Sequence, residues 1–232
     1  MRLNRFLAQA GTASRRKAEA FILEGRVTIN GVICSKLATH VEPSDLVRVD
    51  GRIVRSQPLL YVLLNKPPGY VTTRSDERSR RTIYDFLPPD FLNLSHVGRL
   101  DIESGGLILL TNDGDFALRL THPRYHVEKE YLVHLDRDFD PEDMPKVRRG
   151  VYLAEGRARF EALYRVNSRV VKVVLTQGIN RQVRRVFAAL DYKVLRLRRL
   201  RIGLLCEHKL PPGAYRMLTA AEVAALGHKQ RV

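Results

Sequence analysis

Residues 98–112 read GRLDIESGGLILLTN. Three glycines surround a single aspartate, Asp101, and four aliphatic residues with Thr-Asn follow them. Glycine permits tight turns and a close approach of the backbone to a ligand, while a short aliphatic run bounded by turn residues is typical of a buried strand. The stretch therefore predicts a loop that feeds a buried strand and holds Asp101 and its neighbour Arg99 on a rigid scaffold. Taken alone, such an aspartate is more often a turn residue that bonds its own backbone.

Strand patterns dominate the chain on both sides of this stretch, with a Pro-Pro-Gly turn at 67–69. Leu195 and Leu197 alternate with arginines before the phase shifts to Leu200 and Ile202, which predicts a β-bulge near Arg198 and Arg199. We expect a mixed, mainly antiparallel sheet with strands at 61–64, 70–73, 107–110, 131–135 and 170–175. We expect helices at 180–190 and 220–226, the second opened by a capping box from Thr219 to Glu222.

The first 55 residues have a different pattern. Apolar residues at helical spacing end at Gly11, and a second helix begins after Ser14, a good N-cap, and ends at Gly25. The dipeptides Asn30-Gly31 and Asp50-Gly51 then predict hairpin turns beside strands at 27–29 and 46–49. The fold class is therefore α+β, with a small module at 1–55, a linker at 55–58 and a larger domain at 59–232.

The charge balance points to a polyanionic partner. The chain has 40 Lys and Arg against 25 Asp and Glu, a formal net charge of +15, which is unusual for an enzyme of small metabolites. Its two cysteines, Cys34 and Cys206, fit neither a disulfide framework nor a zinc site, and we expect no metal. We find no signal peptide and no apolar run near the roughly eighteen residues of a membrane span. We therefore expect a cytoplasmic protein without a membrane partner.

Basic residues gather at the start of the second helix, where cationic side chains and a helix N-terminus could converge on phosphates. A solvated helix face explains the same pattern equally well. The arrangement RLNRFLAQAG, SRRKAEAFILEGRVTING and DLVRVDG resembles the alpha-L RNA-binding module first described in a ribosomal protein, whereas a DNA-binding helix-turn-helix fits the following strands poorly. The RNA-binding candidates in the whole chain are Arg2, Arg5, Ser14, Arg15, Arg16, Lys17, Arg26, Arg99, Lys129, Arg181 and Arg185.

Three motifs of the larger domain resemble one enzyme family. The string G-R-L-D-x-x-S-x-G with its aliphatic run resembles the signature of the ribosomal pseudouridine synthases of the RsuA, RluB, RluE and RluF group. Glu128-Lys129-Glu130-Tyr131 is similar to the family's K-x-Y motif, whose tyrosine lies against the target base; alone, Tyr131 reads as a half-buried strand aromatic. Residues 177–185, QGINRQVRR, resemble the third motif, in which the second arginine, here Arg184, pairs with the catalytic aspartate.

The resemblance implies a pseudouridine synthase fold and an isomerisation that needs no cofactor. The bond from ribose to the base nitrogen breaks, the uracil turns, and carbon 5 of the base rejoins the ribose. An ionised carboxylate, here Asp101, acts as nucleophile at ribose carbon 1 or as base at carbon 2, and a nearby guanidinium keeps it ionised. The target base must leave its stack, and Tyr131 is the expected stacking partner.

We therefore expect an enzyme that isomerises a uridine in ribosomal RNA, with Asp101, Tyr131 and Arg184 as catalytic residues. The strings EKEYLV and GINRQVRR resemble the large-subunit, RluF-like members, which favours 23S rRNA or a pre-ribosomal particle as the partner, and a monomeric enzyme is expected. The alternatives are a synthase acting on small-subunit or transfer RNA, and a non-catalytic RNA-binding factor in ribosome assembly.

Overall fold

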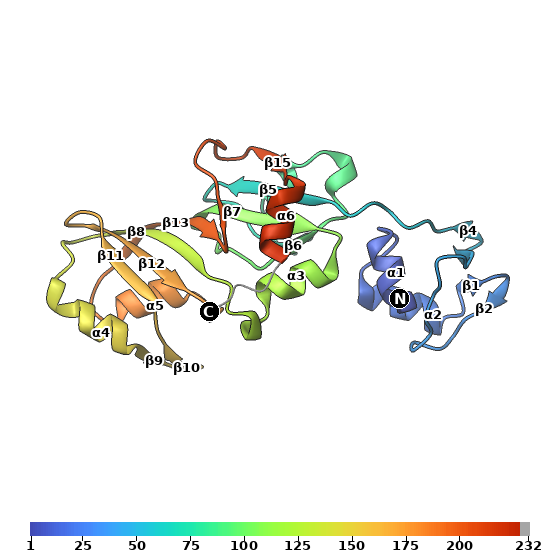
Figure 1. The fold of residues 1–232 in the computed structure, drawn as a ribbon, viewed down its shortest axis with the longest axis horizontal. Coiled ribbons are helices and arrows are strands. Elements are labelled where there is room, and N and C mark those ends of the chain that lie inside the picture. The colour runs from blue at the N-terminus through green and yellow to red at the C-terminus, as the bar shows by residue number, and fades with distance from the viewer. Residues whose placement is uncertain (228–232) are drawn as a thin grey trace. The chain divides into compact units, whose positions relative to one another are not determined.

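A computed structural model describes residues 1–227 of the 232. The chain forms two compact units (Figure 1): one comprises Met1–Leu60 with the short segments Asn93–Ser95 and Thr111–Gly114, and the other comprises the rest. The expected larger domain, 59–232, extends into residues 228–232, which lie outside the described residues. Each unit is described by itself below.

The N-terminal unit has its own small core. Helices α1 (Leu3–Gln9) and α2 (Arg15–Leu23) pack with a four-stranded sheet of order β2-β1-β3-β4. Its strands are β1 (Val27–Ile29), β2 (Val32–Ile33), β3 (Val47–Val49) and β4 (Arg52–Ile53). The buried residues of this core come from both helices, from β1 and β3, and from the segment between β2 and β3: Leu3, Leu7, Ala18, Phe21, Ile22, Val27, Val41, Val47 and Val49.

The local signals of this unit act as the sequence predicts. The Ser14 side chain accepts a hydrogen bond from the Lys17 backbone N–H at 3.3 Å and so caps α2. The dipeptides Asn30-Gly31 and Asp50-Gly51 have positive φ at both residues, which matches the right-handed twist of the strands that they join in two antiparallel hairpins.

The large unit is built on one mixed sheet of order β11-β12-β8-β13-β7-β5-β15, and β14 and β6 add to β13 and β7. The β13–β7 pair is parallel, whereas β8 pairs antiparallel with both β12 and β13. A separate hairpin consists of β9 and β10. The strands are β5 (Tyr61–Lys66), β6 (Ser95–Val97), β7 (Ser104–Thr111), β8 (Lys129–Leu135), β9 (Val151–Leu153), β10 (Gly156–Ala158), β11 (Ala162–Arg165), β12 (Val170–Leu175), β13 (Val194–Ile202), β14 (Leu205–Cys206) and β15 (Tyr215–Met217).

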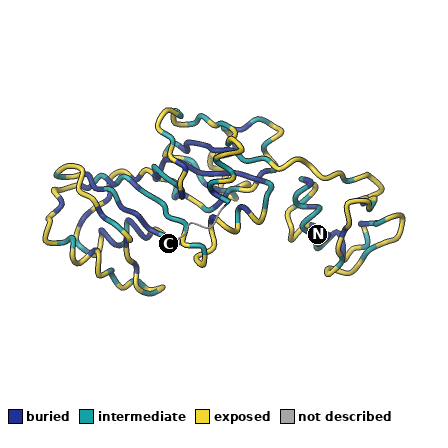
Figure 2. Tube along the Cα trace, in the orientation of Figure 1, coloured by how far each residue is buried: buried dark blue, intermediate teal, exposed yellow. Residues whose placement is uncertain are grey.

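Helices pack against the sheet, and β5, β7 and β12 are mostly buried, whereas the central β13 has both buried and exposed residues (Figure 2). Every residue of β7 is buried. Leu107 and Leu109 of β7 share a core with apolar residues of α3 and α6, while Phe187 of α5 packs in a separate aromatic group with Phe139, Phe160 and Tyr192. The helices are α3 (Gly114–Thr121), α4 (Met144–Arg149), α5 (Gln182–Ala188) and α6 (Ala220–Gly227), with 3-10 turns at Ile83–Phe86, Pro89–Phe91, Pro123–Tyr125 and Pro141–Asp143.

Some expected elements differ from the observed ones. The expected strand at 70–73 is wrong, because Val71 makes only an isolated bridge to Thr82. The expected helix at 180–190 is shorter, since α5 begins after Arg181, which has a left-handed backbone with φ 51°. The expected bulge is confirmed: the register of β13 against β8 shifts between Arg199 and Arg201, and again between Val194 and Arg196.

Candidate active site

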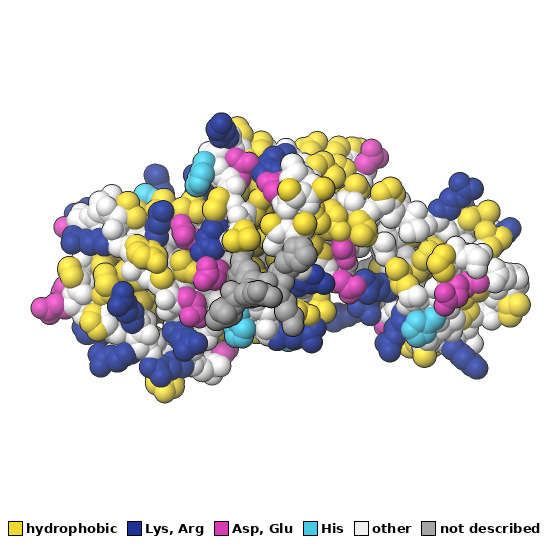
Figure 3. Space-filling view, in the orientation of Figure 1, with side chains coloured by type: hydrophobic (Ala, Val, Ile, Leu, Met, Phe, Trp, Pro, Cys, Tyr) yellow, Lys and Arg dark blue, Asp and Glu magenta, His cyan; other side chains and the backbone are white. Residues whose placement is uncertain are grey.

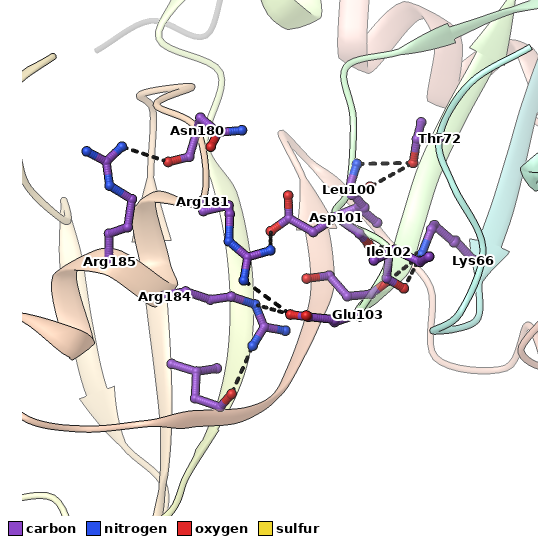
Figure 4. Close-up of polar contacts among 12 residues, drawn as sticks. Lys66, Thr72, Leu100, Asp101, Ile102, Glu103, Asn180, Arg181, Arg184 and Arg185 are labelled. Atoms are coloured by element: carbon purple, nitrogen blue, oxygen red, sulfur yellow. Dashed lines mark hydrogen bonds and ion pairs between the residues drawn. The ribbon is translucent and has the colours of Figure 1, made fainter. Parts of the chain in front are cut away.

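A buried lysine organises the loop that carries Asp101. Lys66, the last residue of β5, is 0% exposed, and its ammonium donates to the backbone carbonyls of Ser104 (2.6 Å), Asp101 (3.1 Å), Pro67 (3.1 Å) and Ile102 (3.4 Å). Burial lowers the pKa of Lys66 to about 8, an effect that the Asp101 carboxylate opposes. Lys66 therefore satisfies several carbonyls that the tight turn leaves pointing inward (Figure 4).

A second contact fixes the start of the same loop. The Thr72 hydroxyl donates to the Leu100 carbonyl at 2.8 Å and accepts from the Leu100 backbone N–H at 3.3 Å. The Gly69 backbone N–H donates to the Ile102 carbonyl at 2.7 Å. Residues on both sides of Asp101 are thus bonded to the segment 66–72, and the aspartate side chain projects from a loop that is held at both ends.

Gly106, the third residue of β7, occupies a position that only glycine can take. Its φ is +104°, and a Cβ there would lie 2.3 Å from the Arg199 carbonyl oxygen and 2.4 Å from the Arg199 nitrogen. Only glycine lets β7 approach β13 so closely, because these neighbours are backbone atoms that cannot turn aside. The approach sets where β7 begins and hence where the preceding loop lies.

Asp101 is paired with a different arginine from the one expected. Its Oδ2 lies 3.8 Å from Nη1 of Arg181, which was expected only to contact RNA. Arg184, the expected partner, instead places Nε 3.6 Å from Oε2 of Glu103 and donates from Nη1 to the Val194 carbonyl at 2.8 Å. In this structure Asp101 therefore forms its ion pair with Arg181, and the catalytic role expected of Arg184 stays a prediction. Arg181 is the residue before α5 and Arg184 lies in the first turn of this helix, where the bond to the Val194 carbonyl holds its guanidinium near the start of β13.

Tyr131 lies in β8 and is 8% exposed, with Arg199 directly opposite it in β13. The Arg199 guanidinium donates to the Leu107 carbonyl at 2.6 Å and to the Tyr131 hydroxyl at 3.4 Å. Because Arg199 pairs with both Gly106 and Tyr131 in the sheet, the backbones of these two residues lie two strands apart, roughly 10 Å. The sheet thus places the expected base-stacking residue near the Asp101 loop.

The basic residues expected to bind RNA in the large unit have different surroundings. Arg99 is exposed. Lys129 is partly buried, its ammonium donates to the Val127 carbonyl at 3.1 Å, and burial lowers its pKa to about 8. Arg185 is held by both carboxylate oxygens of Glu155, at 2.9 and 2.7 Å. Arg99 is thus the one of these three whose position best fits a phosphate contact.

In the N-terminal unit, Arg15, Arg16 and Lys17 are exposed in the first turn of α2, next to its capped end. Arg26 is held by Asp50 at 2.9 and 2.6 Å and by Glu24 at 3.1 Å, and its guanidinium lies over the Phe21 ring. Arg26 is therefore engaged in ion pairs, whereas the start of α2 presents positive charge to solvent. Lysines and arginines are visible over both units in Figure 3.

Sequence reasoning missed three residues of this region. Lys66 carries a weak signal, a lysine at the end of an otherwise apolar strand before the Pro-Pro-Gly turn. Arg199 lies at the predicted phase shift, where the sequence does not distinguish it from the neighbouring arginines, although it is only 3% exposed. Glu103 has no distinguishing signal. Among the described residues, no cluster of His, Cys, Asp and Glu could hold a metal ion, and no helix is long and apolar enough to cross a membrane.

The chain matches two families of known proteins. Residues 60–189, more than half of the chain, match the RNA pseudouridylate synthase family. The chain belongs to this family. Residues 1–47 match the S4 domain, so the synthase carries an RNA-binding S4 domain ahead of its catalytic sheet.

Similar proteins cover nearly the whole synthase. An uncharacterized RNA pseudouridine synthase of Aquifex aeolicus is 39% identical over 97% of this chain and 93% of its own. The ribosomal large subunit pseudouridine synthase B of Bacillus subtilis is 37% identical over 97% of this chain and 95% of its own. A crystal structure of a pseudouridylate synthase, 32% identical, superposes with a TM-score of 0.72 and covers 97% of this chain and 99% of that one. The protein is therefore a pseudouridine synthase whose substrate is RNA, and the expected fold and family are confirmed.

Proposed function

We propose that this synthase isomerises one uridine of large-subunit (23S) ribosomal RNA, with Asp101 as its catalytic carboxylate. The observation that carries the catalytic assignment is the loop geometry. Asp101 is the carboxylate that the Lys66 and Thr72 contacts hold at the start of β7, and it has a guanidinium 3.8 Å away. The likeness to the Bacillus large-subunit synthase over nearly the full length of both chains supports the choice of RNA.

Asp101, Arg181 and Tyr131 have separate roles in the proposed reaction. The ionised Asp101 carboxylate acts on the ribose of the target, either by attack on carbon 1 or by removal of the proton on carbon 2, and the bond to the base nitrogen breaks. The Arg181 guanidinium, whose Nη1 lies 3.8 Å from Oδ2 of Asp101, holds the carboxylate in its orientation toward the ribose. Tyr131 provides an aromatic face for the flipped uracil, which rejoins the ribose through carbon 5 and loses its carbon 5 proton.

RNA docking is assigned to the small unit. We propose that residues 1–55 form the docking module and 59–232 the catalytic domain, with Arg15, Arg16 and Lys17 contacting phosphates. These three side chains are exposed and lie at the N-terminus of α2, where the helix dipole also favours an anion. We further propose that the synthase acts as a monomer in the cytoplasm on ribosomal RNA or a pre-ribosomal particle.

Pseudouridine mapping tests this function. Ribosomal and transfer RNA are sequenced for pseudouridine in cells with the gene, without it, and complemented with the wild-type or the Asp101→Asn gene. We expect one large-subunit site to disappear on deletion and to return with the wild-type gene alone. Loss of a small-subunit or transfer RNA site would refute the choice of RNA, and restoration by Asp101→Asn would refute the catalytic assignment.

A further inference from the structure

We propose that Glu103 is a positioning residue of this synthase, which gathers the guanidinium groups of Arg181 and Arg184 beside the Asp101 carboxylate before RNA binds. The inference rests on the proposed role of Asp101. It assigns a function to a residue that no motif marks and that lies two positions after the aspartate on the same loop.

Glu103 contacts both Arg181, which precedes α5, and Arg184 in its first turn. Its Oε2 lies 3.2 Å from Nη2 of Arg181 and 3.6 Å from Nε of Arg184, and Nη1 of the same Arg181 lies 3.8 Å from Asp101 (Figure 4). Two carboxylates of one loop and two guanidinium groups from the start of α5 and the residue before it thus form a single ion network. Glu103 makes the closer contact with Arg181, so it contributes more than Asp101 to the orientation of that side chain.

Arg184 depends on Glu103 for its charge balance. Its side chain is 12% exposed, and within the described part of the chain its Nε and Nη2 are buried without a hydrogen-bond partner. Within the same residues, Glu103 is the carboxylate that comes within 4 Å of it. A guanidinium taken out of water is costly unless a charge of opposite sign is near. Removal of the Glu103 charge would leave Arg184 without a carboxylate within 4 Å among the described residues.

Arg181 depends on Glu103 for its direction. Its side chain is 41% exposed, and its backbone is the left-handed residue before α5. Long exposed side chains keep one conformation only when their contacts offset the entropy that is lost. Without Glu103, Arg181 would keep only its 3.8 Å contact with Asp101, the positive charge of Arg184 would repel it, and its side chain would turn toward solvent. Asp101 would then lose the cation that faces it.

The exposure of Glu103 separates this role from a simple surface charge. Its side chain is 56% exposed beside a site that must receive a polyanion, so its charge opposes RNA binding. Removal of a surface carboxylate would tighten binding and leave the chemical step unchanged. Removal of a positioning carboxylate would slow the chemical step, whatever happens to binding. The two roles therefore predict different changes in two separate measurements.

The test uses the full chain with Glu103→Gln, Glu103→Asp and Glu155→Gln substitutions. Glu155 is the matched control, because it is similarly exposed (49%) and pairs with Arg185 of the same helix. Unmodified ribosomal RNA of both subunits is transcribed with tritium at carbon 5 of uridine, and tritium release is measured in a single turnover at saturating enzyme. RNA affinity is measured in parallel by filter binding.

We expect the single-turnover rate of Glu103→Gln to fall roughly 10- to 100-fold, the range that a small misplacement of catalytic groups causes, with RNA affinity equal or higher. Glu103→Asp should recover much of the rate because it restores the charge, and Glu155→Gln should keep the wild-type rate. A normal or faster rate for Glu103→Gln, a loss confined to affinity, or loss of the fold on circular dichroism would each overturn the proposal. Asp101→Asn is measured beside them: turnover by that variant would refute the catalytic assignment itself, whatever Glu103 does.

Discussion

Replacement of Lys66 by methionine should destabilise the large unit and displace the Asp101 loop. The substitution keeps a long unbranched side chain in the buried space but removes the ammonium that lies within hydrogen-bond distance of four backbone carbonyls. The Asp101 and Ile102 carbonyls keep backbone donors, from Ser104 and Gly69, whereas those of Pro67 and Ser104 lose their lysine donor. With about 1–2 kcal/mol for each buried carbonyl that loses its donor, the unfolding free energy should fall by about 2–4 kcal/mol. Relief from burying a charge places the value toward the lower end.

Urea denaturation followed by circular dichroism measures this loss. Because the chain has two compact units, the relevant quantity is the midpoint of the transition of the larger one. Lys193→Met is the matched control, since Lys193 is an exposed lysine of the same unit and should change stability by less than about 0.5 kcal/mol. Equal midpoints for the two variants would refute the role given to the Lys66 ammonium.

Four further outcomes are expected. Asp101→Asn should abolish tritium release from labelled RNA while RNA binding stays near normal, because the change removes only the ionised carboxylate. Arg184→Lys and Arg184→Ala should both lose most single-turnover activity, since a lysine cannot contact the Val194 carbonyl and a carboxylate with the same planar group. Arg185→Ala is the neighbour control, and a near-normal rate for Arg184→Lys would argue against a catalytic role of Arg184. Removal of residues 1–55 should leave a folded catalytic unit with weaker RNA binding and a flatter salt dependence; an unchanged affinity and slope in filter binding would exclude docking by this module. Burial lowers the pKa of Lys66 from 10.5 to about 8, so between these pH values the unfolded chain holds more protons than the folded chain. The unfolding free energy of wild type relative to Lys66→Met should therefore rise with pH from 8 to 10.5. A flat or falling difference in urea titrations would contradict this direction.

Local signals predicted much of the fold because each depends on few residues. The capping box is an example: the Thr219 backbone N–H donates to the Glu222 carboxylate at 2.8 Å, and the Glu222 backbone N–H donates to the Thr219 hydroxyl at 3.2 Å. The failure at 70–73 has an equally local cause. Residues of this segment have high strand propensity, but the Val71 N–H donates to the Arg81 carbonyl and its own carbonyl accepts from the Ile83 N–H, so its backbone groups bond a loop.

The candidate site was predictable in its residues but not in all of its contacts. The family motifs marked Asp101, Tyr131 and the arginine-rich start of α5. Which arginine faces Asp101 depends on where α5 begins and on side-chain rotamers, because Arg181 lies just before the helix and Arg184 in its first turn. Lys66 contacts the loop, and Glu103 contacts Arg184, through geometry that forms only when β5, β7 and α5 come together, so the sequence around each gives little or no sign of its role.

The central strand β13 comes late in the chain, so the catalytic sheet can be completed only late in synthesis. The strands β11, β12 and β8 lie on one side of it and β7, β5 and β15 on the other, although β13 is formed by residues 194–202, near the end of the chain. A ribosome synthesises Asp101 and Tyr131 long before it reaches the strand that joins their two halves of the sheet. Contacts between such distant residues form slowly because long segments must first be ordered. The nascent synthase should therefore remain inactive until β13 has emerged, even though its RNA-binding module is complete from the first quarter of synthesis.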